Sequence, residues 1–382
     1  MQDLFILIAV VGVVIVLAAL VFFVTRKPEP REEQAASDYA AGLNYLVSGD
    51  LNLALQKLKD AARKDTNNID AYIKIGEILR TIGHIDQAIK VHRDLTARNS
   101  LTPVQRLEIY RALVQDYEAK GRYEQALQVL RQILELKRDD LWAREKELQL
   151  YEAMGDWEKA ADTYKKLAKS KNGIQKSRLA LYKVEQGKKI AAKGDEKQAR
   201  TLFREAIKMD AKCAAAYLAL SDSYLRENRT EEAIGILEKF MASAPEKAAL
   251  AFSRVKELLF SIGEFGSIET VYQQVIKRSP ENWQAYLALA EIKAKKGDLD
   301  EAIQLCQQIL QRNPDYTPAR EHLIRFYHRN GKDDLAVEQA LAIINVAGNS
   351  LPQYTCNQCG YSASEPFWHC PKCRKWETVE GI

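Results

Sequence analysis

Apolar residues at the start of the chain form one long uninterrupted run. Residues 4–24 carry no charged or strongly polar side chain. As a helix rising about 1.5 Å per residue, this run spans the hydrocarbon core of a bilayer, which is about 30 Å thick. A cleaved signal peptide would have a basic start, a shorter apolar core and a cleavage site of small residues. This chain instead begins Met-Gln-Asp, and its long apolar run ends Phe22-Phe23-Val24. The pattern predicts an uncleaved transmembrane anchor in residues 1–25.

The residues after this run predict the topology of the chain. Arg26 and Lys27 follow the apolar segment directly. Because basic residues flank membrane spans on the cytoplasmic side, everything downstream is expected to be cytoplasmic. Residues 26–36 include Pro28 and Pro30 among mixed charges, and they are interpreted as a juxtamembrane linker.

From residue 37 to residue 347 the hydrophobic pattern has a helical period and repeats itself. Each repeat has a turn residue, usually Gly, followed five positions later by a small residue. The pairs are Gly49/Ala54, Gly83/Ala88, Gly121/Ala126, Gly155/Ala160, Gly194/Ala199, Asn228/Ala233, Gly263/Ile268, Gly297/Ala302 and Gly331/Ala336. Successive turns lie 34, 38, 34, 39, 34, 35, 34 and 34 residues apart. A period of 34 with this pattern is typical of the tetratricopeptide repeat (TPR), a helix–turn–helix unit.

The repeat positions have a physical explanation. Glycine, or Asn228 in its place, tolerates the positive φ that reverses the chain, and the small residue lets the second helix lie close to the first. An aromatic residue stands eleven positions before several turns, and prolines recur where the second helix should end. These residues are Tyr72, Tyr110, Tyr217, Phe252 and Tyr286, and Pro245, Pro280 and Pro314. We therefore expect an all-α fold, a TPR superhelix of about nine units.

Four cysteines near the C-terminus form two Cys-x-x-Cys hooks. They are Cys356, Cys359, Cys370 and Cys373. Two such hooks at this separation predict one metal ion held by four thiolates, in a small domain of residues 354–382. His369 precedes the third cysteine and is interpreted as a spectator, because four sulfurs already complete a tetrahedron. Cys213 and Cys306 lie apart in helical sequence and are expected to be unreactive.

The sequence around the hooks resembles a rubredoxin-type pair of metal-binding knuckles. Gly360 after the first hook lets the backbone turn toward sulfur, whereas Arg374 stands after the second hook, where glycine is usual. That departure argues against a symmetric, electron-carrying site. Four aromatic residues are expected to form an apolar shell around the metal: Tyr361, Phe367, Trp368 and Trp376. So short a segment needs the metal to fold, and we expect it to be clasped against the final repeats.

Composition adds mainly exclusions. The chain of 382 residues has a net charge of +4, and no P-loop, nucleophile elbow, zinc-protease or dinucleotide motif is present. We therefore predict no catalytic residue, no organic-cofactor site and no enzyme activity. Residues 165–193 contain ten Lys or Arg and one acid. They are interpreted as solvated helix faces, with anionic lipid as an alternative; nucleic acid is not expected, because no recognition module accompanies them.

The order of anchor, TPR array and terminal knuckle resembles the lipopolysaccharide assembly protein B family (LapB, also called YciM) over the whole chain. The resemblance implies a non-enzymatic inner-membrane adaptor of Gram-negative bacteria, single-pass, with a periplasmic N-terminus and cytoplasmic TPR and metal domains. It further implies that the adaptor presents the deacetylase LpxC to the membrane protease FtsH, and that it associates with lipopolysaccharide transport and regulatory membrane proteins. The family assigns iron to the four cysteines, while their chemistry allows zinc equally.

Two other functions remain open from the residues alone. One is a rubredoxin-like electron-transfer protein on a TPR scaffold, and the other is a generic membrane-tethered TPR co-chaperone. The sequence does not identify which groove residues bind partners or whether the protein forms a homodimer.

Overall fold

The computed structural model describes residues 31–170, 173–345 and 354–381. The predicted membrane span, residues 4–24, lies outside the described residues, as does the first part of the predicted linker. Among the residues described, no helix is both long and apolar enough to cross a bilayer. The first described helix, α2, begins at Arg31, directly after Pro30 and inside the stretch assigned to the linker. Proline is tolerated at a helix start, and the Glu- and Ala-rich sequence after it favours a helix.

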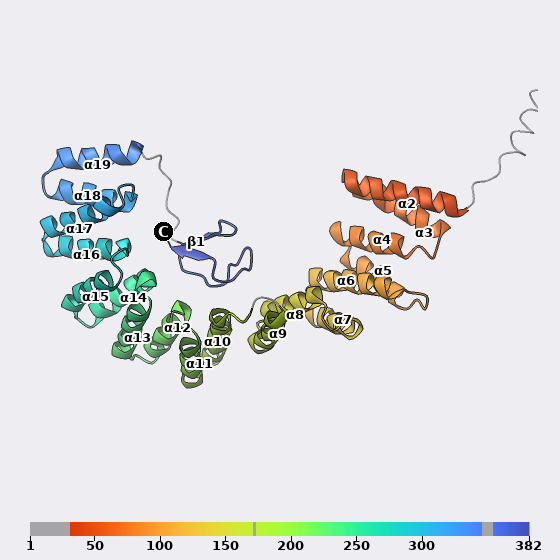
Figure 1. Ribbon diagram of the computed structural model, residues 1–382, viewed down its shortest axis with the longest axis horizontal. Coiled ribbons are helices and arrows are strands. Elements are labelled where there is room, and N and C mark those ends of the chain that lie inside the picture. The colour runs from red at the N-terminus through yellow and green to blue at the C-terminus, as the bar shows by residue number, and fades with distance from the viewer. Residues whose placement is uncertain (1–30, 171–172, 346–353, 382) are drawn as a thin grey trace, which may run out of the picture. The chain divides into compact units, whose positions relative to one another are not determined.

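Helices dominate the described residues (Figure 1). The helices are α2 (Arg31–Ser48), α3 (Leu51–Lys64), α4 (Ile69–Thr81), α5 (Ile85–Thr96), α6 (Pro103–Ala119), α7 (Tyr123–Leu136), α8 (Leu141–Met154), α9 (Trp157–Ser170), α10 (Lys176–Ala191), α11 (Glu196–Met209), α12 (Ala214–Arg226), α13 (Thr230–Ser243), the 3-10 helix η1 (Pro245–Lys247), α14 (Ala249–Ser261), α15 (Phe265–Arg278), α16 (Trp283–Lys296), α17 (Leu299–Arg312), α18 (Thr317–Arg329) and α19 (Asp333–Asn345). The strands are β1 (Tyr354–Cys356), β2 (Ser362–Ala363) and β3 (Val379–Gly381).

The turn residues behave as the repeat pattern predicts. All nine have positive φ, from 60° at Asn228 to 99° at Gly297. The small residues five positions later are all buried, and seven of the nine have no exposed surface. Helices α13, α15 and α17 each end two positions before a proline, which is Pro245, Pro280 and Pro314 respectively. The helix boundaries therefore follow from local backbone rules that the sequence makes visible.

The described chain divides into two compact units, and the boundary in the sequence lies between Met154 and Gly155. The first unit contains a buried polar cluster on α4, α5 and α6. His92 and Asp116 are both fully buried, and the His92 Nδ1 atom lies 2.5 Å from the Asp116 Oδ2 atom. The other ring nitrogen lies 3.1 Å from the Ile73 carbonyl oxygen, and Arg80 donates to Asp116 at 2.7 Å. Each polar group thus has a partner, which is the condition for burying it.

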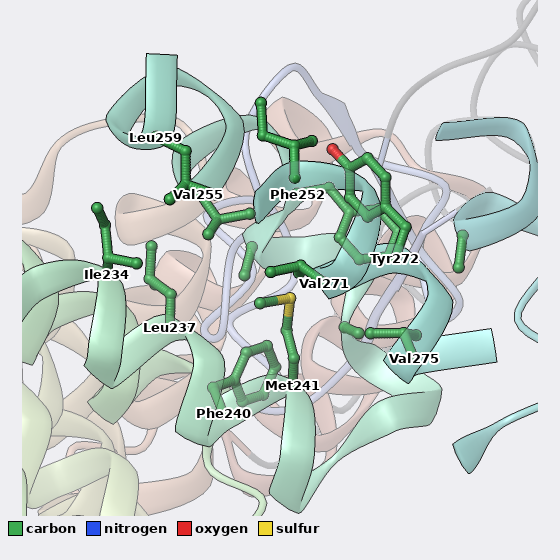
Figure 2. Packing of buried hydrophobic residues seen from close by; sticks show 14 of the residues in the cluster. Ile234, Leu237, Phe240, Met241, Phe252, Val255, Leu259, Val271, Tyr272 and Val275 are labelled. Atoms are coloured by element: carbon green, nitrogen blue, oxygen red, sulfur yellow. The ribbon is translucent and has the colours of Figure 1, made fainter. Parts of the chain in front are cut away.

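The apolar core of the second unit consists of several clusters of buried side chains. Figure 2 shows one part of it, where α13, α14 and α15 pack through Leu237, Phe240, Phe252 and Tyr272. The Phe252 and Tyr272 rings meet edge to face, with centroids 4.9 Å apart. Phe252 is one of the aromatic residues that stand eleven positions before a turn, and it fills the space between helices as expected.

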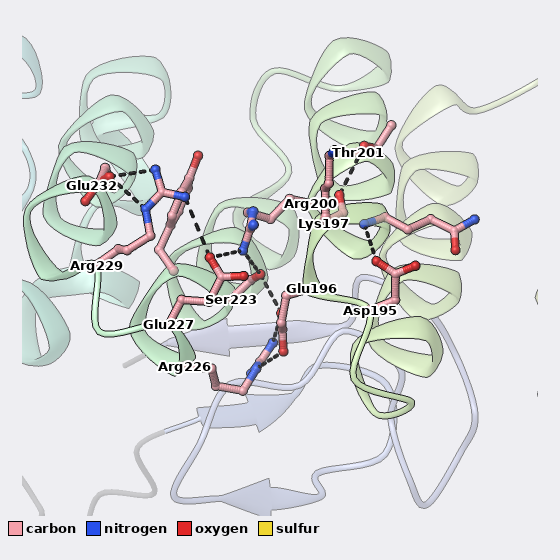
Figure 3. Close-up of polar contacts among 12 residues, drawn as sticks. Asp195, Glu196, Lys197, Arg200, Thr201, Ser223, Arg226, Glu227, Arg229 and Glu232 are labelled. Carbon is pink, nitrogen blue, oxygen red and sulfur yellow. Dashed lines mark hydrogen bonds and ion pairs between the residues drawn. The ribbon is translucent and has the colours of Figure 1, made fainter.

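A polar network on α11 and α12 joins neighbouring repeats (Figure 3). Glu196, the first residue of α11, accepts hydrogen bonds from Arg226 and from the Ser223 hydroxyl. Arg200 pairs with Glu227 at 2.9 Å and donates to the Ser223 hydroxyl. The Arg226 hydrogen bond, partly opposed by burial, lowers the pKa of Glu196 below its usual value. This network fixes the contact between the second helix of one repeat and the first helix of the next.

The C-terminal segment, residues 354–381, forms a small knuckle rather than another helix. Its three strands are antiparallel in the order β2-β1-β3, with Tyr354 opposite Ala363 on one side and Gly381 on the other. The fold is thus an all-α TPR solenoid with a small β-knuckle at its C-terminus.

Candidate metal centre and the adjoining cavity

The knuckle brings the four predicted cysteines together. Their Sγ atoms all lie within 4.8 Å of one another, and the Cys356–Cys373 and Cys359–Cys370 pairs are each 3.6 Å apart. Sulfurs about 2.3 Å from a tetrahedral ion would be about 3.8 Å apart. The donor set therefore fits one thiophilic metal ion, and thiolates suit zinc and iron alike.

The two hooks have the same backbone arrangement. In the first, Cys356 donates its amide to the Tyr361 carbonyl, and the Gly360 amide donates to the Cys356 carbonyl. In the second, Cys370 donates to the Lys375 carbonyl, and the Arg374 amide donates to the Cys370 carbonyl. Gly360 has φ of 66°, and Arg374 takes the same left-handed conformation with φ of 55°. The inference that arginine breaks the symmetry of the site was wrong, because the fold imposes glycine's conformation on Arg374.

Hydrogen bonds around the sulfurs prepare them unequally for ionisation. Burial raises the pKa of Cys356, but the Thr378 hydroxyl at 3.1 Å and nearby backbone amides outweigh it and bring the pKa to about 6. For Cys373 a backbone hydrogen bond lowers the pKa, but burial and the neighbouring sulfurs outweigh it and raise the pKa to about 12. Four thiolates this close repel one another, so a bound cation is what lets all four ionise.

The expected aromatic shell exists only in part. Tyr361 and Phe367 do pair within the knuckle, at 5.4 Å between ring centroids. Trp376 instead packs edge to face on Tyr182 of α10, at 5.3 Å, and on Trp157 of α9, at 6.1 Å. Two of the four aromatic residues, Trp368 being the other, therefore serve to dock the knuckle onto helices.

This docking site differs from the one expected. Among the described residues, these contacts join the knuckle to α9, α10, α12 and α14 in the middle of the chain, whereas the final repeats were expected. The Ser177 hydroxyl at the start of α10 donates to the Glu377 carboxylate at 3.1 Å, a contact between residues 200 positions apart. The prediction assumed that neighbours in sequence would be neighbours in space. The tryptophans of the knuckle instead pack on aromatic and alanine-rich helix surfaces that are distant in the sequence.

A cavity of about 470 Å³ lies between the docked knuckle and the first helices of successive repeats. Its apolar lining includes Leu181 of α10, Leu250 of α14 and Trp368 of the knuckle. Lys212 and Glu246 also line it, and they form an ion pair at 2.7 Å. Sequence reasoning did not identify these residues, because no motif marks them and the cavity exists only after the knuckle docks.

Three further residues, Cys213, Cys306 and His369, lie outside the metal site. Cys213 and Cys306 are buried, and burial raises the pKa of each thiol to about 12, which disfavours reactivity. Cys213 nevertheless lines the cavity. His369 is not part of the sulfur cluster; its ring stacks on Trp376, with centroids 4.5 Å apart.

Comparison with known proteins agrees with both parts of the fold. A rubredoxin metal binding domain matches residues 354–380, and tetratricopeptide repeats match residues 117–179, 191–253, 263–317 and 293–355. Lipopolysaccharide assembly protein B of Escherichia coli K12 is 27% identical over 350 residues, covering 90% of this chain and 89% of its own. Over nearly its whole length the chain is thus similar to lipopolysaccharide assembly protein B. The Haemophilus influenzae protein of that name is 22% identical, again over 90% of this chain and 89% of its own.

These two relatives align along nearly the whole chain, and not only along the repeats. Among solved structures, the crystal structure of MamA matches 41% of this chain and 92% of its own at 24% identity, with a TM-score of 0.30.

Proposed function

We propose that the protein is a non-enzymatic adaptor in lipopolysaccharide assembly, anchored in the inner membrane by residues 4–24. In this proposal the N-terminus is periplasmic, and the repeats and the knuckle are cytoplasmic. Nearly full-length relatives named lipopolysaccharide assembly protein B support the process. The TPR array supports the role, because such arrays present surfaces for protein partners.

The observation that carries the proposal is the cavity between the knuckle and the repeats. A volume of about 470 Å³ is in the range of ligand-binding clefts. Its apolar lining can accept a side chain of a client protein, while charged groups such as Lys212 and Glu246 stand beside it to orient the chain. The knuckle closes one side of this cavity, so the client site depends on the knuckle being folded and docked.

The client we propose is the deacetylase LpxC, presented to the membrane protease FtsH. The anchor places the client beside the protease, and the cysteines at 356, 359, 370 and 373 hold one iron or zinc ion that folds the knuckle. In this role the metal supplies folding energy, and no electron passes through it. Lipopolysaccharide transport and regulatory membrane proteins are further proposed partners.

Filling the cavity tests the proposal. Ser253 is exposed on α14 and lines the cavity, so Ser253→Trp should obstruct it without disturbing the core. Ser261→Trp, on the same helix but outside the cavity lining, is the matched control. We expect the half-life of LpxC in cells to lengthen several-fold with Ser253→Trp and to stay unchanged with Ser261→Trp. Equal LpxC half-lives in the two strains would contradict client binding at this cavity. Unchanged LpxC turnover after depletion of the whole protein would contradict the adaptor role itself.

A further inference from the structure

A second cavity, also of about 470 Å³, lies on another side of the knuckle, between it and the start of α10. Its lining is basic: Arg178 of α10 and Arg374 and Lys375 of the knuckle stand against one acid, Glu377. This lining shares only Glu377 with the cavity proposed above to bind the client, so the two sites can be tested separately.

Backbone strain is concentrated at this second cavity. Within the described part of the chain, three non-glycine residues have positive φ: Asn228, Arg374 and Glu377. Asparagine adopts this conformation readily, whereas arginine and glutamate do so at a cost. Both of the latter line the cavity. Strained residues that persist together at a hollow point to a role for their side chains, because glycine would satisfy the backbone alone.

The Arg374 side chain has no structural task that explains its presence. Among the described residues its guanidinium has no hydrogen-bond or ion-pair partner, although its backbone amide and carbonyl are both used. Lys375 donates to the Gln358 amide oxygen at 2.8 Å, which leaves its charge without a counter-ion there. Arg178 lies over the Tyr164 ring at 4.8 Å, a contact that holds the side chain in place.

We propose that this cavity binds an acidic segment of a protein partner, with Arg374 pairing to a carboxylate. A guanidinium forms two parallel hydrogen bonds with a carboxylate, so the free arginine fork suits this group. The cavity is far larger than one ion, and Trp376 is part of its lining. Glu377 opposes a dianion such as phosphate more strongly than a single carboxylate. The side-chain amide of Asn357 also lines the cavity. Its nitrogen donates to the Glu380 carboxylate at 2.9 Å, and its oxygen can accept a hydrogen bond from the backbone of a bound peptide.

The test uses the full metal-loaded chain in detergent, with capped hexaglutamate as the probe and binding measured by calorimetry. We expect hexaglutamate to bind, hexaglutamine not to bind, and the affinity to fall as salt is raised. Arg374→Gly should weaken binding about tenfold, because it removes a charged hydrogen-bond pair while keeping a residue that favours positive φ. Arg374→Lys should recover part of the loss. Arg131→Gln, an exposed arginine on α7, controls for the change in net charge and should leave the affinity within about twofold.

Three outcomes would overturn the proposal. One is equal affinity of the native protein and Arg374→Gly for hexaglutamate, which would place binding elsewhere on the basic surface. Another is no binding of hexaglutamate at all. The third is tighter binding of inorganic phosphate than of hexaglutamate, lost in Arg374→Gly, which would make this a phosphate site. Metal content measured on each variant verifies that the knuckle is intact.

Discussion

The repeats and the knuckle of the second unit are ordered by different means. The helices bury large apolar side chains almost completely, among them Tyr182, Phe203, Phe240 and Tyr272. Within the described knuckle, residues 354–380, the buried residues are Cys356, Cys370 and Thr378. The repeats therefore have a core of their own, whereas the knuckle has sulfur atoms, one hydroxyl and a docking face.

Because of this difference, the folding free energies of the two regions come from different sources. Solenoid stability is a sum of repeat and nearest-neighbour terms, so the helices do not need the knuckle. A segment of this size without an apolar core folds through metal binding and contact with its neighbours. Substitutions in one region should therefore leave the other largely intact.

The largest effect is expected from Cys370→Ser. Structural metal sites contribute about 10 kcal/mol or more of folding free energy, so loss of one thiolate should release the metal and unfold the knuckle. Metal per chain should fall to near zero, while far-UV circular dichroism retains the helical signal. Cys306→Ala, buried in α17 outside the sulfur cluster, should keep its metal. A Cys370→Ser protein with full metal content and a protease-resistant C-terminus would show that the knuckle does not need all four thiolates to bind metal and fold.

Next in size is a substitution inside the repeats, Gly187→Ala. A methyl group at Gly187 would lie 2.4 Å from the Phe203 ring, a contact that forces the helices α10 and α11 apart. We expect a loss of about 3 kcal/mol, at the upper end of overpacking costs. Hydrogen exchange of α10 and α11 should report it as lost protection.

Gly235→Ala on α13 is the matched control, since nothing lies within 4 Å of the added methyl group. It should stabilise its helix by about 0.5–1 kcal/mol. Equal protection of α10 and α11 in native protein and Gly187→Ala would contradict the close packing inferred here.

Trp376→Ala tests the docking contact between the two regions. Across the docking contact its ring pairs with Tyr182 and Trp157, and such pairs contribute about 0.5–1.5 kcal/mol each beyond buried area. We expect about 2 kcal/mol of docking free energy to be lost while the metal stays bound. Hydrogen exchange should increase at the face of α10 under the knuckle. Trp283→Ala on α16, which pairs with Tyr286 instead, should leave that face protected; increased exchange there would mean that docking does not depend on Trp376 specifically.

The sequence predicts the helices well because their determinants are local. A glycine or asparagine at each turn and a small residue five positions later define each hairpin within a few residues. The docking of the knuckle could not be predicted in this way, because it joins residues as distant as Ser177 and Glu377. For the same reason no sequence pattern marks either cavity. The Arg374 side chain misled the interpretation of the second hook, since residue type alone does not show which conformation the surrounding fold imposes.

The smallest effects should come from single substitutions of the residue that follows each hook. Arg374 and Gly360 occupy equivalent left-handed positions, with φ of 55° and 66°. Arg374→Gly relieves backbone strain and should stabilise the metal-bound knuckle by about 0.5–1 kcal/mol, whereas Gly360→Ala introduces strain of about 1 kcal/mol. Chelator competition should thus show tighter metal binding in the first variant and weaker binding in the second. If both variants bind metal more weakly than the native protein, the Arg374 side chain itself stabilises the metal site. The strained backbone at Arg374 would then be explained without a protein partner.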